Sequence, residues 1–422
     1  MMKKFLFPIF LFINLTLFSQ TDWTIFAYME GSEGLQHEAL YNTSQLAFGG
    51  VPKNVNMFVQ VHIGSNLSFF YKIEENNIIL LDFIPVGPNT KENIVSTIKR
   101  ILPEYQSKYF GLFLWDHGFG ILEPYYNQET ETWDVEPDGN QFGGCDLMDL
   151  DGEKPKGEEI VKYKGMFING PEKTIMGNKD MVELIRTISE DMLGGKKIDL
   201  LAMDCCMGAM IEHGYQLCDY AKFLVGSQDC ELTDGFDYIN LMLHFKEGHV
   251  LPRQIAQDIV DDYGVYNAKY ATIGRYTMSA MDLSYTYDIA SNNDKIANIL
   301  LQLFEKDRKT FKEICTIARK DCPRFCMIPS YADMHVFYEN LEIALQDFSN
   351  LELVKNLNPL LQENKDLIKA AVVANVAGKV NKGVRGISIY FPLYHIDSTY
   401  EPTKFAQESN WFSFIQNFVA KR

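Results

Sequence analysis

Basic residues are in the minority in this 422-residue sequence: 39 lysines and arginines stand against 56 aspartates and glutamates, which leaves a net charge of −17. Because phosphate backbones select basic surfaces, this balance argues against a general nucleic-acid-binding protein. The sequence also lacks internal repeats and low-complexity tracts. With 46% hydrophobic residues, it can build one large domain or two of medium size.

Cysteine is sparse as well, with eight residues in the whole chain. A chain of this size does not need disulfide staples, although an even count permits them in an oxidising compartment. Cys322 and Cys326 have C-x3-C spacing, but no second pair and no close histidine accompanies them, so a zinc site there is weakly supported. Buried thiols are the simpler interpretation, and a disulfide among Cys315, Cys322 and Cys326 is the alternative.

Only the start of the chain carries a long apolar run. Lys3 and Lys4 precede an almost wholly apolar segment, residues 5–18, and a polar break follows at 19–22. This is the pattern of a secretory signal peptide, and the run is shorter than the roughly 20 residues of a spanning helix. We therefore expect a cleaved signal over residues 1–20, bacterial export to the periplasm or the medium, and no membrane contact afterwards.

The remainder of the N-terminal half alternates short apolar runs with helical patterns. Apolar strands are predicted at 23–29, 55–61, 110–115, 198–203 and 223–226, a hairpin at 69–83, and helices at 35–46, 91–102, 180–192 and 207–218. Such alternation indicates an α/β fold with a largely parallel sheet that is flanked by helices on both faces.

The C-terminal half is more helical. Helices are predicted at 252–263, 289–304 and 360–371, and a late strand at 386–392 is expected to return to a sheet. We therefore divide the mature chain into an α/β domain over residues 21–245 and a partly helical C-terminal region, 246–422, that packs on it.

Two of the apolar strands end in reactive residues. The first is followed by His117 and Gly118, and the second by Asp204, Cys205 and Cys206. Side chains just past the carboxyl ends of parallel strands line a ligand crevice, so these ends can bring a histidine and a cysteine together. A thiol needs a neighbouring base to become a ready nucleophile, which His117 can supply before it protonates the leaving amine.

Backbone groups at the same ends fit this hypothesis. A glycine beside the histidine lets the backbone approach a scissile carbonyl, and the N–H groups of Gly118 and Cys206 could bind the developing oxyanion. Taken singly, a histidine or a cysteine after a buried strand is more often structural, so the spacing alone leaves both roles open.

The motifs at both strand ends resemble those of the caspase-like cysteine peptidases, and among them the clostripain family. Residues 115–118, Trp-Asp-His-Gly, are similar to the histidine motif of the family, and 203–208, Met-Asp-Cys-Cys-Met-Gly, resemble its Phe-Asp-Ala-Cys-Leu-Met element. The resemblance continues in the same order over 219–228, 277–284 and 386–392. It implies a caspase-like catalytic domain with a helical C-terminal extension.

The resemblance also implies an activity. Family members are cysteine endopeptidases that cut after Arg, and sometimes Lys, through a thioester acyl-enzyme, so the expected partners are peptides or proteins with a basic residue at the cleavage position. In that alignment Cys206 is the nucleophile and Cys205 takes the place of Ala, although the adjacent thiols leave this choice open. Asp204 is then a pocket carboxylate for the basic side chain, with Asp229 and Asp234 as further candidates. A turn or capping role for Asp204 is the alternative.

Relatives are often zymogens that cut themselves between the two motifs. Here that interval holds a polar loop, 123–179, longer than compact domains usually carry without a function. Lys156, Lys162 and Lys164 are the candidate positions for self-cleavage; the alternative is that these lysines only solvate the loop.

No cofactor is expected to be required. Some relatives bind calcium, and residues 149–152 with Glu158 match part of an EF-hand-like loop, but Leu147 occupies the first ligand position. Calcium is therefore an alternative at this loop, and no other metal ligands are assigned.

Two other classes of function stay open. A catalytically silent homologue that acts as an exported binding module would be marked by loss of the histidine or the cysteine, and the sequence keeps both His117 and Cys206. A redox or metal protein would use Cys205, Cys206 and the C-x3-C pair, although adjacent cysteines are poorly placed for a disulfide.

Overall fold

The computed structural model describes most of the chain. The described residues are 21–32, 34–64, 67–85, 90–129, 132–136, 168–169, 174–271, 274–325, 328–348 and 351–420. Several predictions lie outside these ranges: the signal peptide, the self-cleavage candidates Lys156, Lys162 and Lys164, the calcium-like segment 147–158, and Cys326.

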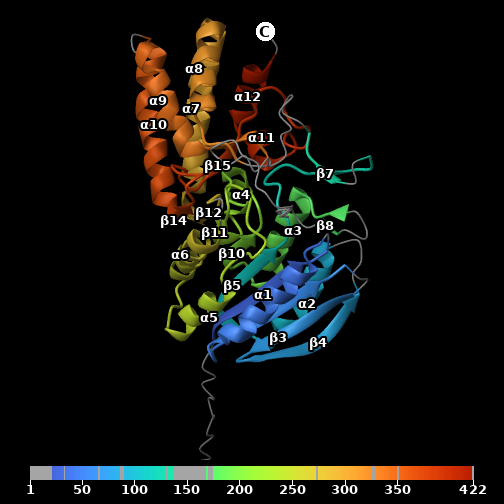
Figure 1. Ribbon diagram of the computed structural model, residues 1–422. Coiled ribbons are helices and arrows are strands. Elements are labelled where there is room, and N and C mark those ends of the chain that lie inside the picture. Colours follow the sequence, from blue (N-terminus) through green and yellow to red (C-terminus); the bar gives the residue numbers. More distant parts are fainter. Residues whose placement is uncertain are drawn as a thin grey trace, which may run out of the picture.

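A nine-stranded sheet forms the lower part of the molecule in the view of Figure 1. In spatial order its strands are β14 (Val372–Ala377), β12 (Thr277–Asp282), β11 (Ala221–Gly226), β10 (Ile198–Asp204), β5 (Ser107–Trp115), β1 (Thr21–Glu30), β2 (Val55–His62), β3 (Leu67–Glu74) and β4 (Asn77–Pro85). The inner strands from β11 to β2 run parallel, and each strand outside them is antiparallel to its inner neighbour. The predicted largely parallel sheet is confirmed.

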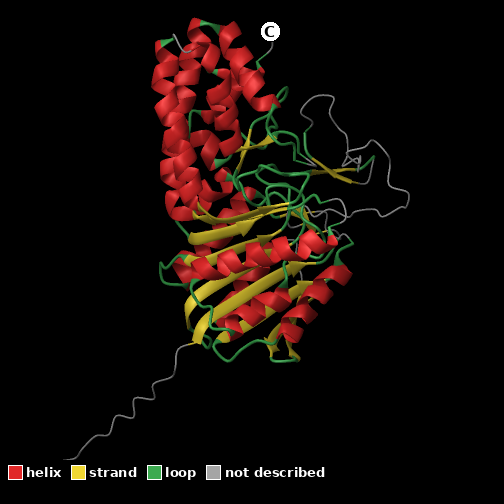
Figure 2. Cartoon of the chain, turned by 60° about the vertical axis from the view of Figure 1, so that its left-hand side comes forward, coloured by secondary structure: helices red, strands yellow, loops and turns green. Residues whose placement is uncertain are grey.

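Both faces of this sheet are buried. In β10, Leu201 and Met203 belong to one hydrophobic core, and Leu200 and Ala202 to the other. A strand that is covered on both faces reads as a continuous apolar run, because successive side chains point to opposite sides. Helices supply the cover, as Figure 2 shows. They are α1 (Gln36–Gly49), α5 (Tyr238–Lys246) and α6 (Pro252–Tyr270) on one face, and α2 (Thr90–Ile101), α3 (Asn178–Thr187) and α4 (Ile211–Leu217) on the other.

Four long helices form a bundle beyond the β14 edge of the sheet (Figure 1). They are α7 (Thr286–Lys306), α8 (Arg308–Lys320), α9 (Met334–Ala344) and α10 (Glu352–Ala371). α10 leads directly into β14, so the bundle is tied to the sheet through the chain itself. Among the described residues, no helix has the length and apolar character needed to cross a membrane. The domain division at residue 245 stays a prediction; β12 and β14, which follow it, both belong to the central sheet.

The other elements are short. They are β6 (Tyr125–Asn127), β7 (Thr132–Asp134), β8 (Ile168–Asn169), β9 (Thr174–Ile175), β13 (Tyr331–Asp333), β15 (Ser388–Tyr390), the π-helical turn η1 (Ile188–Met192), the 3-10 turns η2 (Leu283–Tyr285) and η3 (Gln346–Phe348), α11 (Lys404–Glu408) and α12 (Trp411–Val419).

The late strand expected at 386–392 forms as β15 but does not join the central sheet. It pairs with β13, and its Ser388 N–H donates to the carbonyl of Ala209 at 2.9 Å. The edge of the central sheet beside β12 is filled instead by β14. The strand predicted at 386–392 therefore forms in a small sheet with β13, and the late strand of the C-terminal region that returns to the central sheet is β14.

The helix predicted from Met207 begins four residues later, at Ile211. The intervening backbone bonds to other parts of the chain: Met207 N–H donates to the carbonyl of Asp229 at 3.1 Å, and Ala209 N–H to that of Ser227 at 2.9 Å. Donation by these N–H groups would not by itself prevent a helix, but Met207 has a left-handed φ of 58° and the carbonyl of Ala209 accepts from Ser388 N–H, so no helical turn forms here. The segment 207–210 instead runs along residues 227–229 on one side and contacts Ser388 through the carbonyl of Ala209.

Glu212, in the first turn of α4, is fully buried. Its Oε1 accepts hydrogen bonds from Tyr390 N–H and Tyr400 O–H at 2.8 and 3.2 Å, while its Oε2 has no hydrogen-bond partner in the described part of the chain. Burial raises the pKa of Glu212 from 4.5 to about 7, despite these two hydrogen bonds. A neutral carboxyl therefore suits this position.

We predict that Glu212 makes the protein less stable as the pH rises from 4.5 to about 7, because the unfolded carboxyl loses its proton before the folded one does. Glu212→Gln keeps a neutral side chain of the same shape. Its free energy of unfolding near pH 8 should be about 2–3 kcal/mol higher than that of wild type. Chemical denaturation across this pH range measures the difference, with the exposed Glu313→Gln as matched control. A Glu212→Gln variant as pH-dependent as wild type would contradict the prediction.

Candidate active site

The strand ends that carry His117 and Cys206 lie side by side. β5 and β10 are neighbouring parallel strands in which Trp115 pairs with Asp204. His117 and Cys206 each follow two residues later, so they stand at equivalent positions at one edge of the sheet. Neighbouring strands lie about 4.8 Å apart, and the ladder continues past β5, where Asp116 N–H donates to the carbonyl of Asp204 at 3.3 Å. The structure brings the predicted pair together.

Gly118 packs directly against the backbone of Cys206. A Cβ atom at Gly118 would lie 1.9 Å from the carbonyl oxygen of Cys206 and 2.8 Å from its nitrogen. Real side chains do not approach a backbone so closely, so this contact requires glycine. The two residues whose N–H groups are expected to form the oxyanion site thus lie against each other.

The turn after β10 has an uncommon backbone. Met207 adopts φ 58°, a left-handed conformation that non-glycine residues seldom take. Such conformations persist only where the surroundings hold them, and here the Met207 N–H is bonded to Asp229. The chain therefore reverses sharply just past Cys206, which fixes the position of the thiol.

The thiol of Cys206 faces the segment that follows β11. Its Sγ accepts a hydrogen bond from Glu231 N–H at 3.1 Å and lies 3.9 Å from the carbonyl oxygen of the same residue. Cys206 is fully buried, and His117 is only 9% exposed. The sulfur is therefore closed to a peptide in this arrangement of the site.

Asp204 ends β10 with its carboxylate buried beneath the same segment. Its Oδ2 accepts hydrogen bonds from Tyr238 O–H at 2.7 Å and Phe236 N–H at 3.1 Å, and a Cβ at Gly235 would lie 2.8 Å from both carboxylate oxygens. Burial, followed by the neighbouring Asp204 charge, raises the pKa of Tyr238 well above its usual value, so the phenol stays a donor.

Asp229 is buried and already engaged. Arg275 Nη1 lies 3.1 Å from its Oδ2, Asn381 Nδ2 donates to the same oxygen at 2.7 Å, and Cys230 N–H donates to Oδ1 at 2.8 Å. The chain thus supplies its own guanidinium to this predicted pocket carboxylate. Asp234, the other further candidate, accepts a hydrogen bond from Tyr266 O–H at 2.8 Å.

A second polar group at this edge of the sheet was not predicted. Glu30 and His62, the last residues of β1 and β2, are fully buried, and His62 Nδ1 lies 2.6 Å from Glu30 Oε1. Tyr28 O–H donates to the other oxygen of Glu30 at 2.9 Å. Polar residues just past an apolar run were the signal that identified His117, and Glu30 and His62 end such runs too.

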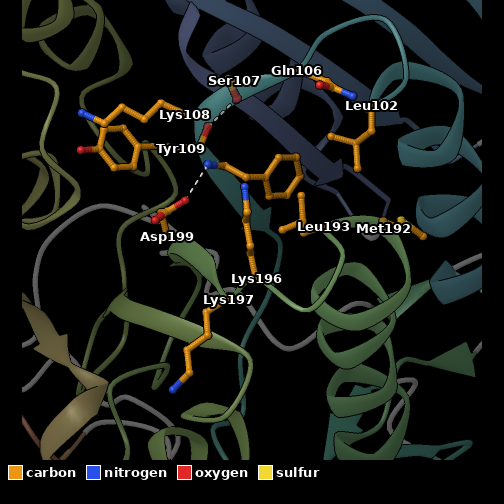
Figure 3. A pocket seen from close by; sticks show the side chains of 11 residues that line it. Leu102, Gln106, Ser107, Lys108, Tyr109, Met192, Leu193, Lys196, Lys197 and Asp199 are labelled. Carbon is orange, nitrogen blue, oxygen red and sulfur yellow. Dashed lines mark hydrogen bonds between the residues drawn. The ribbon is translucent and has the colours of Figure 1, made fainter. Parts of the chain in front are cut away.

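A cavity of about 220 Å³ lies elsewhere, at the amino ends of β5 and β10 (Figure 3). Asp199 on its wall accepts hydrogen bonds from Phe110 N–H at 2.9 Å and Lys222 Nζ at 2.6 Å. Because His117 and Cys206 follow the opposite ends of these strands, the cavity is separate from the candidate active site.

Comparison with known proteins fits this arrangement. A model of the clostripain family of C11 peptidases matches residues 176–418. The chain belongs to the clostripain family. It is therefore a cysteine peptidase, as the motifs predicted. The matched residues include Asp204 and Cys206 but begin after His117. The place of His117 in the site therefore rests on the register of β5 and β10.

Three solved structures share the fold. Two are secreted C11 cysteine proteases from Bacteroides thetaiotaomicron. The first is a complex with an irreversible peptide inhibitor; it has 14% identity and a TM-score of 0.62, and the match covers 93% of this chain and 99% of that one. The other, iotapain, has 17% identity, a TM-score of 0.60 and coverage of 94% and 99%. An inactive zymogen C11 protease from Parabacteroides distasonis has 16% identity, a TM-score of 0.58 and coverage of 94% and 98%. No curated protein matches the sequence. The predicted caspase-like fold is confirmed.

We predict that Gly118→Ala lowers kcat/KM for peptide substrates by about 100-fold or more, because the new methyl group must displace the histidine strand end or the cysteine turn. Steady-state kinetics measure the loss, and circular dichroism checks that the fold persists. Gly194→Ala is the control without a close contact: nothing lies within 4 Å of a Cβ there, although its backbone is left-handed (φ 65°), unlike that of Gly118. Equal activity in both variants would show that the Gly118 contact is not needed.

Proposed function

We propose that the protein is an exported endopeptidase that cuts after Arg or Lys, with Cys206 as nucleophile and His117 as its base. The observation that carries this proposal is the register of β5 and β10, which places both residues at one edge of the sheet. Export rests on the signal-like start of the sequence; the similar proteases from Bacteroides thetaiotaomicron are described as secreted.

The chemistry follows from these positions. His117 takes the thiol proton, and the Cys206 sulfur attacks the scissile carbonyl carbon. The N–H groups of Gly118 and Cys206 donate to the oxyanion. When the C–N bond breaks, His117 returns the proton to the leaving amine and a thioester remains. Water, deprotonated by His117, hydrolyses the thioester and restores the thiol.

The contact of Cys206 with Glu231 favours it over Cys205 as nucleophile. Its sulfur faces the segment 229–236, which also covers Asp204. Movement of this one segment would uncover a thiol and a carboxylate together, as a substrate with a basic side chain requires. Cys205 is a buried thiol that takes no part in the reaction in this proposal.

Asp204 is the proposed acceptor for the basic side chain. A buried carboxylate attracts a guanidinium or ammonium more strongly than an exposed one, because the surroundings screen the charge less. Asp229 is the weaker acceptor, since a substrate would have to displace Arg275 and Asn381 from it.

The full burial of Cys206 supports a precursor that needs activation. We propose that cleavage within 123–179, at Lys156, Lys162 or Lys164, releases the segment over the thiol. The similar protein from Parabacteroides distasonis is described as an inactive zymogen. Burial of the thiol also suits the alternative, a catalytically silent binding module, and the variants below separate the two.

We predict that Cys206→Ala lowers kcat/KM on Arg- and Lys-terminated fluorogenic peptides by about 1,000-fold or more and leaves the chain uncut, because no thioester can form. Cys205→Ala, the matched control, should keep most of the activity and the cutting pattern. Gel electrophoresis and mass spectrometry follow the cutting. Full activity in Cys206→Ala with loss in Cys205→Ala would reverse the assignment, and a wild type that stays inactive after loop nicking would favour the binding module.

We predict that Asp204→Asn reduces kcat/KM for Arg and Lys peptides by about 100-fold, since the buried cation of the substrate would lose its counter-charge. The amide oxygen can still accept the hydrogen bond of Tyr238, so the fold should persist. Peptides with a neutral residue at the cleavage position provide the internal comparison, and Asp261→Asn on the exposed surface of α6 is the matched variant, which should keep the preference. An unchanged preference for basic residues in Asp204→Asn would place the pocket elsewhere.

A further inference from the structure

Five metal-ligating side chains gather where α5 ends and α6 begins, away from the strand ends that carry His117 and Cys206. They are His244 near the end of α5, Glu247 and His249 in the connection, and Asp258 and Asp262 on α6; together they are called the α5–α6 cluster here. One ligand atom from each of His244, Glu247 and His249 lies within 4.8 Å of the other two.

Each histidine of the cluster is oriented by an aspartate. Asp262 Oδ2 lies 2.8 Å from His244 Nε2, and Asp258 Oδ2 lies 2.7 Å from His249 Nδ1. A carboxylate that accepts one ring N–H leaves the other ring nitrogen of a neutral imidazole with a free lone pair. This carboxylate–histidine pairing is the arrangement that orients histidines toward metal ions in proteins.

The free nitrogen of His244 is the informative atom. His244 Nδ1 is buried and has no hydrogen-bond partner among the described residues. Glu247 Oε2 lies 3.9 Å from it, and so does Asp258 Oδ2, the oxygen that contacts His249; both distances are too long for hydrogen bonds. A lone pair that faces two anionic oxygens is repelled, and either a proton on this nitrogen or a metal cation beside it removes the repulsion. Distances of this size are close to those between ligands that share one ion.

The donor set selects the class of ion. Two imidazoles and one carboxylate suit Zn²⁺ and similar transition metals, whereas Ca²⁺ prefers oxygen ligands only. Side chains of the cluster are partly accessible, from 13% exposed for Asp258 to 68% for Glu247, so an ion can enter and Glu247 can adjust its rotamer.

We propose that the α5–α6 cluster binds one divalent transition-metal ion of the zinc class, with His244, His249 and Glu247 as ligands and with Asp262 and Asp258 orienting the two histidines. The ion ties the end of α5 to the connection that follows it, and Asp262 and Asp258 tie the two histidines to α6. α5 begins at Tyr238, which donates to Asp204, so the ion braces the helix that covers the candidate pocket. This site does not depend on the proposed catalytic pair.

Zinc titration of the full chain tests the proposal. All variants carry Cys206→Ala, so that the thiol cannot bind the metal and the chain stays whole. Isothermal titration calorimetry should find one Zn²⁺ per chain, and Zn²⁺ should raise the thermal unfolding midpoint, whereas Ca²⁺ should do neither at this cluster. His249→Ala, His244→Ala and Glu247→Gln should each weaken zinc binding at least about tenfold.

His37→Ala on the exposed face of α1 is the matched control and should bind zinc like its parent. If His244→Ala fails to fold, the more exposed His249→Ala and Glu247→Gln still decide the matter. Absence of zinc binding by a folded parent, or equal binding in the cluster variants and the parent, would overturn the proposal and leave the cluster as a set of ion pairs.

Discussion

The pairing of β5 with β10 is the constraint on which the site depends. Because Trp115 lies opposite Asp204, His117 and Cys206 arrive together at one edge of the sheet. Both strands are buried on both faces, so a slip of one residue would exchange the side chains of the two hydrophobic cores. The position of the reactive pair is therefore set by packing across the whole sheet, and local turns such as that at Met207 only refine it.

The segment after β11 controls access to the thiol of Cys206 and the carboxylate of Asp204 in the closed arrangement. Its backbone covers the thiol at Glu231, and its turn at Gly235 covers the carboxylate of Asp204. At its start, Asp229 is held by Arg275. One continuous stretch thus covers both the nucleophile and the candidate pocket, and α5 follows it directly. Whatever braces α5, including the proposed ion, limits how far this cover can move.

Local patterns in the sequence predicted the features that depend on local chemistry. The continuous apolar runs of β5 and β10 and their polar ends could be identified without partners, and the family motifs connected them. The start of α4 could not be placed in this way, because residues 207–210 are held by Ser227, Asp229 and Ser388, which are distant along the chain. The His244, Glu247 and His249 spacing is visible in the sequence, but their alignment with α6 is visible only in three dimensions.

Covalent labelling of the nucleophile tests the central claim most directly. Activated protein would be treated with an irreversible peptide inhibitor that ends in Lys or Arg and carries a thiol-reactive ketone, and the modified residue would be mapped by mass spectrometry. The account predicts a single adduct on Cys206 that is lost in His117→Ala. An adduct on Cys205 or Cys230, or labelling of Cys206 that does not depend on His117, would contradict it.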